Sequence, residues 1–175
     1  MREIIKDKQV VQDEWIVLRL QEGETAADVS IPAGKVIVPL QVWKTRRATI
    51  GTRSDVGVWL ASDERPENLK DDVGTIPVIA VDFPKFTDGR GYSIAYNLRA
   101  RLGYQGELRA IGDVLRDQLF YMQRVGFNAF ATRPDRNIHD ALKGLTDFSD
   151  VYQTSWDQKS PLFRRVVRDH AAVQA

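Results

Sequence analysis

Four short apolar runs decide the fold of this chain: Val56-Gly57-Val58-Trp59-Leu60, Val78-Ile79-Ala80-Val81, Leu108-Arg109-Ala110-Ile111 and Phe127-Asn128-Ala129-Phe130-Ala131. The runs are nearly continuous in apolar residues, which is typical of strands buried on both faces of a parallel sheet. Helical spacing follows them over residues 65–73, 92–102, 114–125 and 137–145. We therefore predict an α/β fold with four β-α units in a parallel sheet, either an open sheet or a partial TIM-like barrel.

The regions on either side of these units have a different pattern. Residues 1–54 are β-rich, with apolar runs at 15–20 and 36–40, and helical spacing follows over 42–52. Residues 149–175 form a tail in which Ser160 precedes Pro161 at the start of a short basic helix over 160–168. We expect one α/β domain over residues 1–175, with the repeated units in 55–148.

The composition excludes several classes of chemistry. The chain has 175 residues, no cysteine, two histidines and a formal net charge of +1. Without cysteine there is no disulfide, thiolate metal site, iron–sulfur ligand or dithiol redox centre. The near-neutral charge does not favour nucleic-acid binding, and no apolar stretch is long enough to cross a bilayer. We expect a cytoplasmic protein without a metal site, and no cofactor is evident.

Polar residues follow each of the four runs, where parallel α/β folds bind their ligands. If the strands are parallel, these residues gather on one rim: Asp82, Lys85, Asp88, Arg90, Asp113, Arg116, Arg133 and Asp135. The basic members suit an anion, such as sulfite, a phosphate group or the carboxylates of a partner protein. We therefore predict an anion- or partner-binding set of Lys85, Thr87, Asp88, Gly89, Arg90, Gly91, Arg116 and Arg133.

Two features of this rim have alternative interpretations. Gly89 and Gly91 flank Arg90 at a helix start, where they allow a ligand to approach the backbone or simply make a turn, with Thr87 or Asp88 as the N-cap. The catalytic candidates are Asp82 and Asp113, as acid, base or metal ligand. Alternatively, Asp113 caps the helix from Val114, and Asp82 pairs with Lys85 or Arg90.

The remaining candidate groups indicate structural roles. His139 and His170 fall in polar segments, so we expect both to face solvent. We expect four aromatic side chains to pack in the core: Phe120, Tyr121, Phe127 and Phe130.

Residues 78–93 and 106–121, with Gly126-Phe127 after them, are distinctive. They resemble a small bacterial family of unknown function that is often labelled a probable oxidoreductase of sulfite reduction. Members of that family are typically encoded beside the sulfite reductase haemoprotein and the (phospho)adenylyl-sulfate reductase. The resemblance extends from about Trp15 to Phe148 and assigns no catalytic residue.

The resemblance implies an accessory protein of assimilatory sulfite reduction, which docks to the sulfite reductase haemoprotein or its electron donor. Whether the protein is itself an enzyme stays open, because the oxidoreductase label has no matching redox motif in the residues. Two alternatives are a small-molecule enzyme on a partial barrel that uses Asp82 or Asp113, and a purely structural subunit that docks through its basic tail.

Overall fold

A single curled sheet of eight strands organises the protein. The structure is a computed structural model and describes residues 2–165. The strand order is β2-β1-β8-β7-β6-β5-β4-β3. The strands are β1 (Glu3–Lys6), β2 (Gln9–Gln12), β3 (Ile16–Val17), β4 (Val36–Pro39), β5 (Val56–Leu60), β6 (Val78–Phe83), β7 (Glu107–Gly112) and β8 (Ala129–Phe130).

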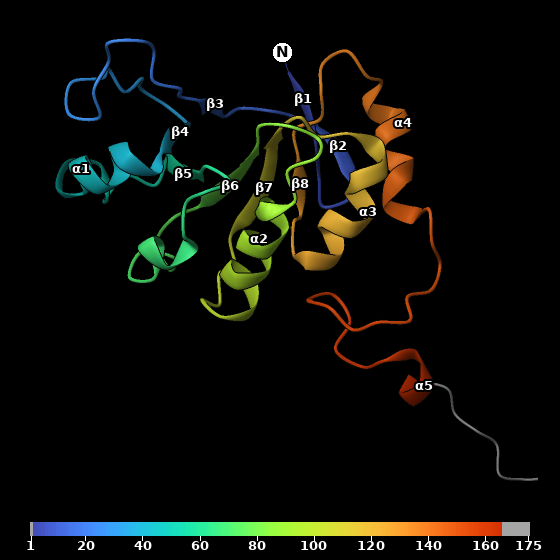
Figure 1. Cartoon of the computed structure of the whole chain (residues 1–175). Coiled ribbons are helices and arrows are strands. Elements are labelled where there is room, and N and C mark those ends of the chain that lie inside the picture. Colours follow the sequence, from blue (N-terminus) through green and yellow to red (C-terminus); the bar gives the residue numbers. More distant parts are fainter. Residues whose placement is uncertain (1, 166–175) are drawn as a thin grey trace, which may run out of the picture.

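The strands from β3 to β8 are parallel and neighbour one another in chain order. Such an order places successive crossovers on the same side of a sheet when each is right-handed. Figure 1 shows the helices following one another along one side of the curled sheet. The helical elements are α1 (Leu40–Ile50), η1 (Pro66–Leu69), α2 (Arg90–Ala100), α3 (Arg116–Val125), α4 (Ile138–Lys143), η2 (Gly144–Thr146) and α5 (Leu162–Arg165).

The two edges of the sheet are close together. The edge strands β2 and β3 are joined by residues 13–15 alone. An extended chain of that length spans about 14 Å between Gln12 and Ile16. The sheet therefore curls into an open, half-barrel shape whose inner face is partly covered by the segment that joins its edges.

Both faces of the sheet are packed. The larger apolar cluster lies between the sheet and the helices and includes Val58, Val81 and Leu108. A smaller cluster includes Ile37, Ala80 and Ile111, from the alternate positions of the strands. The burial of both sets explains why the strands appear in the sequence as continuous apolar runs.

A buried ion cluster adjoins the smaller apolar cluster. The side chain of Arg109 is only 1% exposed. Its Nη1 lies 2.9 Å from Oδ1 of Asp13, and its Nη2 lies 2.6 Å from Oε1 of Glu107. Asp13 belongs to the segment between the edge strands, so this cluster attaches that segment to β7. Buried charges of this kind are tolerated when each is paired.

The mixed α/β class is confirmed, and the sheet is curled and open. Three details of the expectation were wrong. The helix expected over 65–73 is the single 3₁₀ turn η1, which Pro66 opens. The apolar run at 15–20 gives only the two-residue strand β3. The hairpin of β1 and β2 was not foreseen, and both strands join the main sheet instead of a separate β element.

The last described element is the short helix α5. It begins at Leu162, and the structure describes it as far as Arg165. Residues 166–168 of the expected basic helix, and His170, lie outside the described residues. Within residues 2–165, no helix is long and apolar enough to span a membrane.

Candidate functional site

The carboxyl ends of the parallel strands bring several charged residues together. Asp82 occupies the fifth position of β6 and is 8% exposed, so it lies within the strand and not after it. Asp113 follows the neighbouring strand β7, and Arg133 comes shortly after β8. The expected juxtaposition of strand ends is therefore present, but the individual pairings differ from the expectation.

Asp82 is paired with Arg19, which the sequence did not indicate. Nη2 of Arg19 lies 2.6 Å from Oδ1 of Asp82, and Nη1 lies 3.3 Å from Oδ2. The guanidinium also lies 5.0 Å from the ring centroid of Trp59. The expected pairing of Asp82 with Lys85 or Arg90 was wrong. Side chains alternate along a strand, so Asp82 lies on the opposite face from Phe83, which packs toward α2.

Asp113 holds the loop after β6 instead of capping a helix. One carboxylate oxygen accepts the N–H of Phe86 at 2.9 Å, and the other accepts from Arg133 at 3.2 Å. Helix α3 begins at Arg116, with Leu115 as its N-cap residue, and Gln118 accepts the N–H of Leu115. The predicted cap at Asp113 was therefore wrong. The chain first turns at Gly112, whose φ of +93° favours glycine.

The loop before α2 contains a tight ion pair. Nη2 of Arg90 lies 2.7 Å from Oδ2 of Asp88, and Nε lies 3.0 Å from Oδ1. This guanidinium, with the hydroxyl of Ser62, holds the pKa of the Asp88 carboxyl well below its ordinary value. The N-cap residue is Gly89, not Thr87 or Asp88, although Asp88 does accept the N–H of Arg90 at 3.1 Å.

Gly91 is required by packing. A Cβ placed there would lie 2.6 Å from the ring of Phe83, whereas one at Gly89 would meet nothing closer than 3.9 Å. The small residue at position 91 therefore lets α2 approach β6. Of the two glycines, only Gly89 has open space beside its Cα. Lys85 and Thr87 lie on the same loop, and both side chains are exposed.

The other candidate arginines are also engaged by carboxylates. Arg133 lies 2.8 Å from Asp135, which raises the pKa of the guanidinium and lowers the pKa of the Asp135 carboxyl. Arg116 lies 2.9 Å from Asp147 and 3.9 Å from Asp140. An incoming anion would have to displace one of these carboxylates, so anion binding by this set stays a prediction.

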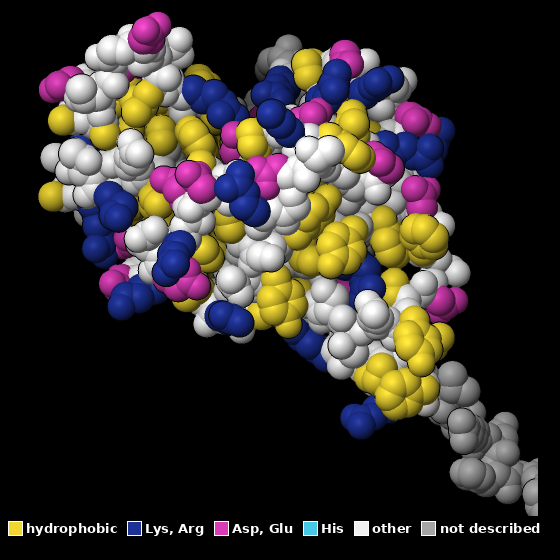
Figure 2. Space-filling view, viewed as in Figure 1, with side chains coloured by type: hydrophobic (Ala, Val, Ile, Leu, Met, Phe, Trp, Pro, Cys, Tyr) yellow, Lys and Arg dark blue, Asp and Glu magenta, His cyan; other side chains and the backbone are white. Residues whose placement is uncertain are grey.

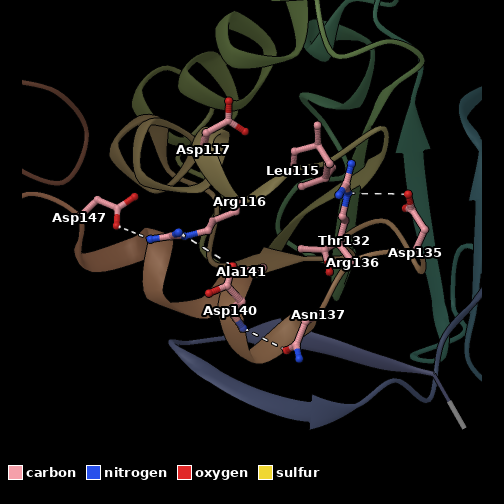
Figure 3. A pocket seen from close by; sticks show the side chains of 11 residues that line it. Leu115, Arg116, Asp117, Thr132, Asp135, Arg136, Asn137, Asp140, Ala141 and Asp147 are labelled. Atoms are coloured by element: carbon pink, nitrogen blue, oxygen red, sulfur yellow. Dashed lines mark hydrogen bonds and ion pairs between the residues drawn. The ribbon is translucent and has the colours of Figure 1, made fainter.

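Arg116 lines a separate pocket of about 550 Å³ between the loops after β7 and β8 (Figure 3). Four aspartates and two arginines lie in its wall, and Asn137 at its edge caps α4 by accepting the N–H groups of His139 and Asp140. The excess of carboxylates does not suit an anion. The charged lining residues are Arg116, Asp117, Asp135, Arg136, Asp140 and Asp147.

The described residues contain no group of three or more His, Asp or Glu side chains placed to hold a metal ion. His139 is exposed in the first turn of α4, as expected. Asp82 and Asp113 come from neighbouring strands, and each carboxylate is paired with an arginine, Arg19 and Arg133 respectively.

A groove between α2 and α3 was missed by the sequence reasoning. It has a volume of about 470 Å³, and Tyr96, Tyr121 and Arg101 are among its lining residues. Tyr92 also lines it, and partial burial raises the pKa of its hydroxyl. Tyr121 was expected in the core, but it is 55% exposed because it lies on the outer side of α3. The spacing of Tyr92 and Tyr96, four residues apart on one helix face, was the available signal.

The fold and site define a curled α/β protein with an ion-paired rim. The family model for a bacterial protein of unknown function (DUF934) matches residues 57–163, which is more than half of the chain. The chain therefore belongs to this family. No curated protein matches it. The match begins within β5, so Arg19 and the hairpin of β1 and β2 lie outside the matched region.

Proposed function

We propose that this protein is an accessory protein of assimilatory sulfite reduction, which docks to the sulfite reductase haemoprotein or to its electron donor. The pathway rests on the resemblance of residues 78–93 and 106–121 to the family described above. The family membership is consistent with that resemblance but carries no function of its own. The docking role rests on a surface of the molecule.

An exposed aromatic face carries the proposal. Large aromatic side chains that face solvent are uncommon on monomeric proteins when they gather, and they are enriched in protein–protein interfaces. Figure 2 shows apolar side chains gathered over α2, α3 and the chain that leads to α5. Five exposed aromatic side chains come from these elements, and we call this set the aromatic face: Tyr96 on α2, Tyr121 on α3, and Phe148, Tyr152 and Phe163 in the C-terminal segment.

The aromatic face is built from two helices and the C-terminal segment. The ring of Tyr121 lies 5.2 Å from that of Tyr92, which packs against Phe83 in the core. The ring of Phe148 lies 4.9 Å from that of Phe120 on α3. Aromatic side chains that already pack against other rings lose little conformational entropy when a partner covers them. Such a surface suits protein docking.

The second candidate is a small-molecule enzyme, which is favoured by the position of Asp82 and Asp113. They lie at the carboxyl ends of neighbouring parallel strands, the place where half-barrel and barrel enzymes hold their reacting groups. On this alternative, purified protein binds or converts a small molecule, and Asp113→Asn abolishes that activity. The commitment of both carboxylates to arginines favours the docking function.

A tagged pull-down tests the proposal, with source cells grown on sulfate as the sulfur source. The proposal predicts that sulfite reductase or its electron donor is recovered in a stoichiometric amount. A Tyr121→Ala variant should lose the partner, and an Ile16→Ala variant, which alters an exposed side chain on the edge strand β3, should retain it. Bait without either partner would contradict the proposal.

A further inference from the structure

The groove in the aromatic face is chemically distinctive. Its lining has three tyrosines, from α2 and α3, and a set of neutral hydrogen-bonding side chains. Among residues 2–165, Arg101 is the only charged residue that lines it, and α2 contains no carboxylate. The remaining polar lining residues are Ser93, Asn97, Thr154 and Ser155.

The third wall of the groove is held in place. Residues 154 and 155 belong to a segment that is anchored to α3 through Arg124. The carbonyl of Arg124 accepts the N–H of Trp156 at 3.1 Å, and its guanidinium donates to the carbonyl of Gln153 and lies 3.4 Å from Asp157. The site is therefore largely preformed, which reduces the entropic cost of binding.

The charge that lines the groove is positive. Arg101 is exposed and has no carboxylate within ion-pair distance among residues 2–165. Lys159 and Arg164 are exposed on the neighbouring segment, where they lie over the rings of Trp156 and Phe163 at 4.3 and 5.8 Å. Asp157, two residues after Ser155, is paired with Arg124, and Asp117 acts on Tyr92, nine residues before Arg101. Along α2 that separation is about 13.5 Å.

We propose that this groove binds an acidic peptide segment of a partner protein. An aromatic or aliphatic side chain of the segment enters between Tyr92 and Tyr121, and a carboxylate pairs with Arg101. The combination of tyrosine, small polar side chains and a single arginine is the composition that protein-binding surfaces use for rigid contacts with adaptable hydrogen bonds. This inference rests on the docking role proposed above and adds the chemistry of the partner.

The charge pattern also sets the direction of the bound segment. Asp117 lies near the end of the groove marked by Tyr92, and Arg101 lies at the other end. The apolar anchor therefore binds beside Tyr92, and the acidic residues extend toward Arg101. A lysine at the position of that carboxylate would be repelled by Arg101.

A titration of ¹⁵N-labelled protein followed by NMR tests the inference. The probe is a capped synthetic peptide of sequence Trp-Leu-Glu-Glu-Asp-Glu, and the control peptide has lysine in place of each acidic residue. We expect saturable shifts of amides in residues 92–101, 121–125 and 154–155 with the acidic peptide alone. Absence of saturable shifts, or equal shifts with the lysine peptide, would overturn the inference.

Two variants locate the contact. Arg101→Glu should lower the affinity for the acidic peptide at least tenfold. Arg136→Glu reverses the charge of an exposed arginine in the pocket of Figure 3, and it should change that affinity less than twofold. Circular dichroism checks that both variants are folded. Equal affinity of Arg101→Glu and the unaltered protein would overturn the inference.

The same variants separate this inference from the proposed function. If Arg101→Glu still recovers sulfite reductase in the pull-down, the groove assignment is wrong and the docking function stands. If the peptide binds at the groove while no component of sulfite reduction is recovered, the groove assignment stands and the proposed function fails.

Discussion

Arg19 and Asp82 lie 63 positions apart in the sequence, and Nη2 of the arginine is 2.6 Å from Oδ1 of the aspartate. The arginine follows the edge strand β3, and the aspartate lies near the end of the central strand β6. Their ion pair therefore ties the edge of the curled sheet to its centre. It also ties the N-terminal region, outside the family match, to the matched region.

We expect Arg19→Ala to lower the free energy of unfolding by about 2 kcal/mol, because it leaves a largely buried carboxylate without its partner. Asp82→Asn should cost less, since the neutral amide needs no counter-charge. A double-mutant cycle measured by urea unfolding should give a coupling energy of about 1 kcal/mol. Additive effects of the two substitutions would show that the pair is not coupled.

Gly91→Ala and Gly89→Ala distinguish a packing glycine from a glycine in open space. The added methyl group at 91 would meet the ring of Phe83 at 2.6 Å. We therefore expect Gly91→Ala to lower the free energy of unfolding by about 1–3 kcal/mol, despite the better helix propensity of alanine. Gly89→Ala should change stability by less than about 0.5 kcal/mol. Thermal unfolding of both variants measures the difference, and equal values would contradict the packing role.

The Asp88 and Arg90 pair predicts an acid-sensitive contribution to stability. The pKa of Asp88 is lower in the folded protein than in the unfolded chain, chiefly because of Arg90. Its contribution is therefore complete above about pH 4 and is lost as the pH falls further. Urea unfolding should show Asp88→Asn less stable than the unaltered protein at pH 7, with the gap narrowing from pH 4 to pH 2.

Arg90→Gln is the control for this pH dependence. It removes the largest cause of the lowered pKa of Asp88, so its stability gap to the unaltered protein should narrow over the same pH range. A gap that stays constant from pH 7 to pH 2 in both variants would argue against the pairing.

Arg99 should be a structural residue, in contrast to its near neighbour Arg101. The buried guanidinium of Arg99 donates to the carbonyls of Gly126, Tyr104 and Gly106 and to the side chain of Asn128, at 2.7–3.1 Å. Arg99→Met leaves these acceptors unsatisfied, and we expect a loss of about 3 kcal/mol in urea unfolding. Arg101→Met should cost less than about 0.5 kcal/mol. Comparable losses would contradict the distinction.

The sequence predicts the strands best where both faces of a strand are buried. The runs at 56–60 and 78–81 are strands in the structure because a central parallel strand must be apolar on both faces. The β1 and β2 hairpin gave no such signal. Its turn uses Asp7 and Lys8 at positive φ, a conformation that sequence patterns associate with Asn-Gly or Asp-Gly.

The candidate site was predictable in position but not in pairing. The order of the runs was enough to place Asp82 and Asp113 at neighbouring strand ends. The partner of Asp82 could not be predicted, because Arg19 reaches it only through the curl of the whole sheet. Tyr121 was misassigned to the core because local spacing does not show which aromatic residue of α3 faces solvent.

Site-specific photo-crosslinking in source cells tests the central claim most directly. A benzoylphenylalanine replaces Tyr121 in the aromatic face, and a second variant carries it at Ile16 on the edge strand β3 as the matched control. Our account predicts that position 121, and not position 16, crosslinks to sulfite reductase or its electron donor, through an acidic segment of that partner. Crosslinks from position 16 alone, or none to either protein, would contradict it.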